Sequence, residues 1–147
     1  MIGTVRFSIT ILLATLSLLA LLPFHFIAIA FRGPNAGAVT MRWHRFVLAL
    51  MGIKVTVHGA PAPERPLLLL SNHMSWLDIP VLASRTPLSF IAKKEVAGWP
   101  VIGWLAKLQR TVFVDRERRH RTGHVADQVA GRLARGDIIV LFAEGTS

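Results

Sequence analysis

The chain of 147 residues contains no cysteine and no tyrosine, and only eight of its residues are acidic. Without cysteine it has no disulfide, no thiolate metal site and no cysteine nucleophile. Aromatic residues make up 8% of the chain and no nucleic-acid motif is present, so the 17 Lys and Arg do not indicate a nucleic-acid partner. With 52% apolar residues, the composition also differs from that of a disordered chain.

Acidic residues are absent from the first 57 positions, where a long uncharged stretch lies. Phe7 to Phe31 comprises 25 residues without a charged side chain, bracketed by Arg6 and Arg32. As a helix it would extend about 37 Å, enough for a hydrocarbon core of about 30 Å. We predict a membrane helix that either spans the bilayer or lies in its interface. A signal peptide with a cleavage site at 28–30 and the core helix of a soluble protein are the alternatives.

Four cations follow this stretch, against one before it: Arg32, Arg42, Arg45 and Lys54. The positive-inside rule then predicts that the rest of the chain lies on the cytoplasmic side of the inner (plasma) membrane. The Gly-Pro-Asn-Ala-Gly sequence within residues 31–40 predicts a turn. Residues 41–51 predict a short helix, which is either a core helix or an interfacial helix anchored by Trp43.

The remaining residues alternate between strand and helix patterns. The strands are predicted at 53–58, 67–70, 89–92, 111–114 and 137–143, with 67–70 and 137–143 buried; the helices are predicted at 79–83, 96–108 and 122–135, the last stopped by Gly136. This alternation predicts an α/β fold, with a mostly parallel central sheet and flanking helices. We expect N-terminal membrane-anchoring helices over residues 1–52 and the α/β domain over 53–147. We also expect the domain to continue beyond Ser147, because a domain rarely ends directly after a buried strand.

The most informative motif is Asn72-His73-Met74-Ser75-Trp76-Leu77-Asp78, which follows a predicted strand and enters a helix. A turn between His73 and Asp78 can bring the carboxylate to one imidazole nitrogen, which leaves the other nitrogen as a general base. In open α/β sheets, ligands bind at this end of the strands. The other interpretation is structural, because Ser75-x-x-Asp78 is also a capping box.

Two further groups of polar residues follow predicted strands. Arg116 ends Phe113-Val114-Asp115-Arg116, and a guanidinium binds phosphate through two hydrogen bonds. Glu144, Gly145 and Thr146 follow the last strand, where their N–H groups and hydroxyl can hold a phosphate; the alternative is a plain turn. The arginines between 118 and 121 are expected to form a solvated face.

These three blocks, in this order, resemble the glycerolipid acyltransferase family of the lysophosphatidic acid acyltransferase (PlsC-like) type. The resemblance implies that His73, oriented by Asp78, is the general base of an O-acyltransferase that converts 1-acylglycerol-3-phosphate to phosphatidic acid. Arg116, Glu144, Gly145 and Thr146 would then bind the acceptor. The implied acyl donor is acyl-CoA or acyl carrier protein, with no cofactor and no metal. The implied partners are the lysophospholipid acceptor and the membrane.

The sequence departs from the family at two places. Arg110 stands where the second block commonly has Gly, and we expect it to alter the acceptor pocket. The family's fourth block, a Pro in an apolar setting, is absent. Two alternatives therefore stay open: acylation of a lyso-ornithine lipid, and a non-catalytic membrane module that binds anionic lipid through its arginines.

Overall fold

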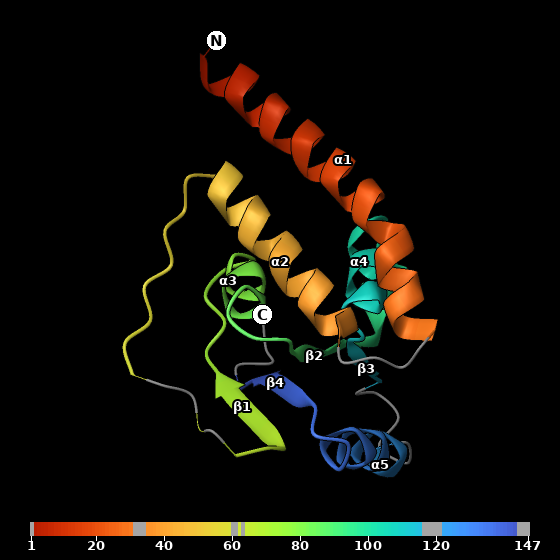
Figure 1. Ribbon diagram of the computed structural model, residues 1–147. Helices are drawn as coiled ribbons and strands as arrows, with labels where there is room; N and C mark the ends of the chain where they lie inside the picture. Colours follow the sequence, from red (N-terminus) through yellow and green to blue (C-terminus); the bar gives the residue numbers. More distant parts are fainter. Residues whose placement is uncertain (1, 31–34, 60–61, 63, 116–121, 144–147) are drawn as a thin grey trace. The chain divides into compact units, whose positions relative to one another are not determined.

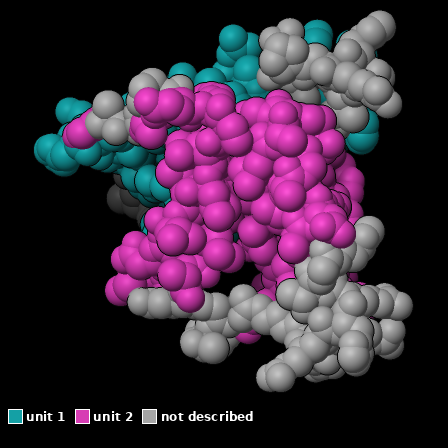
Figure 2. Space-filling view, turned by 90° about the horizontal axis from the view of Figure 1, so that it is seen from below, with its two compact units in different colours: residues 1–58, 75–87 teal, residues 59–74, 88–147 magenta. Residues whose placement is uncertain are grey.

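The computed structural model describes residues 2–30, 35–59, 62, 64–115 and 122–143. By their contacts the residues group into two compact units. One comprises Met1–His58 and Ser75–Pro87, and the other Gly59–Met74 and Leu88–Ser147 (Figure 2). The first is helical and the second contains the sheet. The domain boundary that composition suggests, at residue 52, stays a prediction.

The helical unit contains α1 (Ile2–Ala30), α2 (Asn35–Leu50) and α3 (Asp78–Ala83) (Figure 1). The 21 residues Phe7–Ile27 of α1 are long and apolar enough to cross a membrane. Their large side chains are mostly exposed, as in Phe7 (67%) and Leu16 (53%). An apolar helix that packs little of its surface against protein is typical of a helix in contact with lipid.

The α2 helix packs against both α1 and α3. The Trp43 indole Nε1–H donates to the carbonyl of Ala14 on α1, at 3.4 Å. The Arg45 Nε–H donates to the carbonyl of Ser84, directly after α3, at 2.6 Å. These side chains link the long apolar helix, through α2, to the short helix that begins with Asp78.

The start of α2 corrects the predicted turn at residues 31–40, because residues 35–40 are helical. Gly37 explains the difference. A Cβ on this residue would lie 2.6 Å from the Cβ of Pro87, so the helix approaches Pro87 as only glycine allows. Local propensity argues against a helix at Gly37, but tertiary packing overrides it.

The sheet unit contains four parallel strands: β1 (Leu67–Ser71), β2 (Ser89–Lys93), β3 (Val112–Val114) and β4 (Ile138–Phe142). Their order in the sheet is β1-β4-β2-β3. The core lies in the middle of the sheet, where Ile139 and Val140 of β4 have no exposed surface. The helix α5 (Thr122–Leu133) packs against β3 and β4, and Gly136 ends the turn after it with φ +83°. The α/β prediction, with a parallel sheet and an N-terminal apolar helix, is confirmed.

Residues 67–70 form a strand as predicted, but the prediction that this strand is buried is wrong. Leu68 is 45% exposed and Leu70 is 68% exposed, while Leu67 and Leu69 are half-buried. The exposure alternates along β1, which lies at the edge of the described sheet beside β4, so one face of this strand is left uncovered. A run of four leucines does not reveal that only one of its faces is covered.

Two other predicted elements differ from the structure. Residues 53–58 alternate like a strand but form none, and they pair with no strand in the part of the chain that the structure describes. The helix predicted at 96–108 is interrupted at Pro100: a 3₁₀ helix, η1 (Lys94–Gly98), precedes α4 (Ile102–Leu108). Proline lacks the N–H that a continuous helix needs and restricts the residue before it.

Candidate active site

All four strands end at one edge of the sheet, because they are parallel. The residues that follow them are Asn72 and His73 after β1, Ala143 after β4, Lys94 after β2 and Asp115 after β3. The pairing of β1 with β4 continues to this edge, since the N–H of Ala143 donates to the carbonyl of Ser71 at 3.0 Å. The polar residues of the sequence motifs therefore leave the sheet at its carboxyl edge, where ligands bind in open α/β folds.

His73 lies at this edge, and its ring stacks on the ring of Phe142. The ring centroids are 4.1 Å apart and the planes differ by 21°. Phe142 in turn stacks on Phe90, with centroids 5.8 Å apart and planes 10° from parallel. Because Phe90 is only 4% exposed, the imidazole rests on an aromatic stack that reaches into the core.

Asp78 is the first residue of α3 and belongs to the helical unit. Its Oδ2 accepts a hydrogen bond from the N–H of Ser75 at 2.8 Å. The Oγ of Ser75 accepts from the N–H of Leu77 at 3.1 Å. The carboxylate therefore caps the turn that leads into α3, as the structural interpretation of the motif expects.

Capping does not exclude a catalytic role for Asp78. A carboxylate has two oxygens with about four acceptor positions, so it can accept from an imidazole as well as from Ser75. His73 and Asp78 lie in different units, and their pairing stays a prediction.

Lys94 and Asp115 form an ion pair at the same edge, with 3.1 Å between Nζ and Oδ2. The pair joins the residues that follow β2 and β3, and the carboxylate side chain is only 17% exposed. Sequence reasoning gave Asp115 no role, although it is the residue directly before Arg116.

The predicted acceptor-binding residues Arg116, Glu144, Gly145 and Thr146 lie outside the described residues. The strands before them are described, however, and they set the spacing. The β4 strand is adjacent to β1, whereas β3 is three positions away from it. At about 4.8 Å per strand, β1 and β3 are about 14 Å apart. If Arg116 and His73 act in the same site, their side chains must together bridge this distance along the carboxyl edge.

A family model described as Acyltransferase matches residues 54–147. The chain belongs to the acyltransferase family. It is 42% identical over 147 residues to the lyso-ornithine lipid O-acyltransferase of Rhizobium meliloti, and 44% identical over 147 residues to that of Brucella abortus. Both matches cover 100% of this chain, but 50% and 55% of those proteins.

Relatives with a second name match a shorter part of this chain. The 1-acyl-sn-glycerol-3-phosphate acyltransferase of Neisseria meningitidis is 41% identical over 102 residues, which are 68% of this chain and 40% of that protein. The chain thus spans about half the length of the curated relatives it matches. The crystal structure of the acyltransferase PlsC from Thermotoga maritima has the same fold, with a TM-score of 0.58 at 24% identity over 92% of this chain and 61% of that one.

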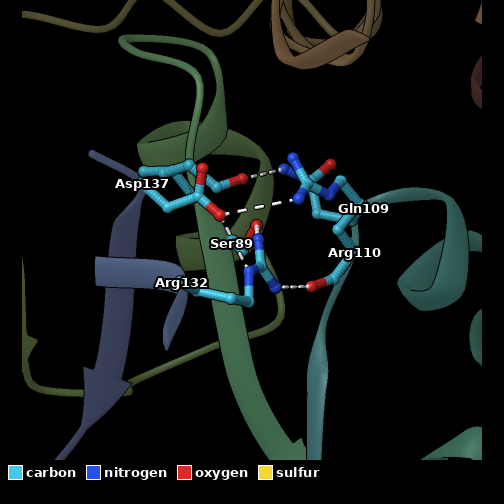
Figure 3. A network of polar contacts seen from close by, with 6 residues as sticks. Ser89, Gln109, Arg110, Arg132 and Asp137 are labelled. Atoms are coloured by element: carbon cyan, nitrogen blue, oxygen red, sulfur yellow. Dashed lines mark hydrogen bonds and ion pairs between the residues drawn. The ribbon is translucent and has the colours of Figure 1, made fainter. Parts of the chain in front are cut away.

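The amino edge of the sheet holds a polar cluster that sequence reasoning missed (Figure 3). Arg132 of α5 is 6% exposed and donates to three groups. Its Nε–H donates to Asp137 Oδ2 at 2.8 Å, one Nη2–H donates to the Ser89 hydroxyl at 2.6 Å, and Nη1–H donates to the carbonyl of Arg110. Burial lowers the pKa of this guanidinium, and the hydrogen bond and charge of Asp137 oppose the shift.

Arg110 belongs to this cluster and not to the carboxyl edge. Its guanidinium Nη2 lies 3.6 Å from Asp137 Oδ2 (Figure 3). Asp137 directly precedes β4, and Arg110 lies two residues before β3. Its φ of +59° places it in the left-handed region that favours glycine, at the end of α4. This explains why the family commonly has Gly here. Arg110 thus lies at the opposite edge of the sheet from His73, and its expected effect on an acceptor pocket stays a prediction.

Proposed function

We propose that the protein transfers a fatty acyl group from a thioester donor to the free hydroxyl of a lysolipid at a membrane surface. The membership of residues 54–147 in the acyltransferase family carries this proposal. The position of His73 at the carboxyl edge, with its ring held on Phe142, supports it. The proposed donor is acyl-CoA or acyl carrier protein.

In the proposed reaction, His73 acts as the general base and Asp78 as its partner. The imidazole takes the proton of the acceptor hydroxyl, whose oxygen attacks the thioester carbonyl. The tetrahedral intermediate then expels the thiolate, which takes up the proton from the imidazolium. The products are an ester and a free thiol, so no cofactor is consumed. Asp78 fixes the imidazole orientation and stabilises its protonated form.

The proposed acceptor has two candidates. The two relatives that match the whole chain at 42% and 44% identity are named lyso-ornithine lipid O-acyltransferases, which favours a lyso-ornithine lipid. The relative named 1-acyl-sn-glycerol-3-phosphate acyltransferase favours 1-acylglycerol-3-phosphate, which Arg116, Glu144, Gly145 and Thr146 would bind. Both acceptors offer a hydroxyl to the same base, so the chemistry is common to them.

We further propose that the protein acts at the inner membrane, with its catalytic part on the cytoplasmic side. Lipid acceptors and products require a catalyst at the bilayer, and α1 carries an exposed apolar stretch of 21 residues. The exposed cations Arg42, Arg45 and Lys54 come after this stretch and favour the cytoplasmic orientation.

The test is an acyl-transfer assay with labelled acyl-CoA and each of the two lysolipids, on membranes that contain the protein or its His73→Ala variant. We expect transfer to one of the acceptors, and a decrease of about 10²–10⁴-fold in the variant, as for loss of a general base. The variant should remain in the membrane fraction. Unchanged activity of His73→Ala would refute the assigned base. Lipid binding without transfer, indifferent to His73 and Asp78, would favour the non-catalytic module.

A further inference from the structure

A second apolar surface lies in the sheet unit, far along the sequence from α1. It is the corner between η1 and α4, formed by Trp99, Pro100, Val101, Ile102 and Trp104. Trp99 is 56% exposed, Val101 67%, Ile102 50% and Trp104 40%. Two tryptophans and two branched apolar side chains thus face outward within six residues. We call this surface the Trp99–Trp104 corner.

The backbone of the corner is strained. Val101 has φ +60° and ψ −57°, and the N–H of Ile102 donates to the carbonyl of Pro100 at 2.6 Å. This is a γ-turn with positive φ, a conformation that is rare and unfavourable for a β-branched residue. Beneath it, Gly103 is closely packed, since a Cβ there would lie 2.5 Å from the carbonyl oxygen of Ala97. The strained turn therefore holds the side chain of Val101 outward on a well-packed base.

The charge around the corner is mainly positive. Lys93 and Lys94 precede it and Lys107 follows it, and all three are exposed. Glu95 is the one acid between residues 93 and 108. Lys94 also pairs with Asp115 while its side chain remains 58% exposed. Exposed apolar groups flanked by lysines match the boundary between acyl chains and anionic headgroups.

We propose that the Trp99–Trp104 corner docks into the interfacial layer of a lipid bilayer, with the flanking lysines at anionic headgroups. Tryptophan is enriched at this depth, because its ring is mostly apolar and its N–H is polar. The same chain carries α1, whose exposed apolar stretch provides a membrane contact in the helical unit. The sheet unit then has a membrane contact of its own, independent of α1 and of the proposed reaction.

The absence of cysteine allows a direct test in the full chain. A spin label is attached to Val101→Cys or Ile102→Cys, and the protein is reconstituted in vesicles of equal parts phosphatidylcholine and phosphatidylglycerol. Collisions with oxygen, which concentrates in lipid, are compared with collisions with a water-soluble nickel chelate. Asp127→Cys, at an exposed position on α5, is the matched control in the same unit.

We expect the labels at Val101 and Ile102 to collide more with oxygen than with nickel, and the label at Asp127 to show the reverse. The proposal would be overturned if the labels at Val101 and Ile102 collided with nickel as often as the label at Asp127 does. Protection from both reagents would also overturn it, because protein, such as a second copy of the chain, would then cover the corner. The Ile102 label keeps the test decisive if substitution at the strained Val101 prevents folding. No turnover is required, so failure of the proposed reaction is a separate outcome.

Discussion

Phe142 lies under the imidazole of His73, with the two ring centroids 4.1 Å apart. The two residues follow or end neighbouring parallel strands, and the register that pairs Ser71 with Phe142 brings them together. The last residue of β4 therefore supports the proposed base, which lies 69 positions earlier in the sequence.

We predict that Phe142→Leu lowers kcat by about 2–10-fold, because stacked aromatic pairs contribute about 0.5–1.5 kcal/mol beyond their buried area. Phe142→Tyr keeps the ring and serves as the matched control, with activity near that of the parent protein. Both variants are compared in the acyl-transfer assay at saturating acceptor. Equal rates for the leucine and tyrosine variants would show that the ring does not position His73.

Asp78 allows its two roles to be separated. The Asn side chain of Asp78→Asn retains an oxygen that can accept from the Ser75 N–H but carries no charge. We therefore expect the free energy of unfolding to change by less than about 0.5 kcal/mol, while activity falls about 10²-fold or more. Asp78→Ala should lose the cap as well, at a further cost of about 1 kcal/mol. If Asp78→Asn retains full activity, the residue is a helix cap only.

Arg110 tests the assignment of the two sheet edges. Glycine tolerates φ +59° without strain, so we predict that Arg110→Gly is more stable than Arg110→Ala by about 1 kcal/mol in denaturant unfolding. Both variants lose the exposed pair with Asp137, which makes alanine the matched control. Neither should change the ratio of activities on the two lysolipids. A shift in that ratio would contradict the location of Arg110 away from the acceptor site.

Arg45 connects α2 to the end of α3. We predict that Arg45→Ala lowers the free energy of unfolding of the helical unit by about 1 kcal/mol, because the carbonyl of Ser84 loses a charged donor. Activity should fall with it, since α3 carries Asp78 at its other end. Arg42→Ala removes an exposed arginine from the same helix and is the control. Thermal unfolding in detergent measures the stability of both variants. Equal losses of stability in Arg45→Ala and Arg42→Ala would exclude a specific role for the hydrogen bond of Arg45.

The sequence predicted the four strands of the described sheet, their parallel direction and the position of His73 after the first of them. The strands at 89–92 and 111–114 were predicted from short apolar runs, and the stop at Gly136 from the φ that glycine allows. Alternation of strands and helices implied a parallel sheet, and the parallel sheet placed the motif at its carboxyl edge. The pairing of His73 with Asp78 stays a prediction. The same holds for the place of Arg116 and Glu144 in the same site.

The errors share a physical cause, which is that local patterns do not report long-range partners. Residues 53–58 have the alternation of a strand but pair with no described strand. The leucines of β1 look uniformly buried but lie at an edge. The burial of Arg132 is hard to predict from the sequence, because its partners Ser89 and Arg110 are 43 and 22 residues away. Only Asp137, five residues on, gave a local signal.

The strand order also has a consequence for synthesis. The described partner of β1 is β4, which lies about 70 residues further along the chain. At roughly 5–20 residues per second, the ribosome needs about 4–14 s to make that partner after β1 has been made. During this interval four consecutive leucines are unpaired in the nascent chain. Slow translation or low temperature would prolong the period in which this segment is open to chaperones or to aggregation.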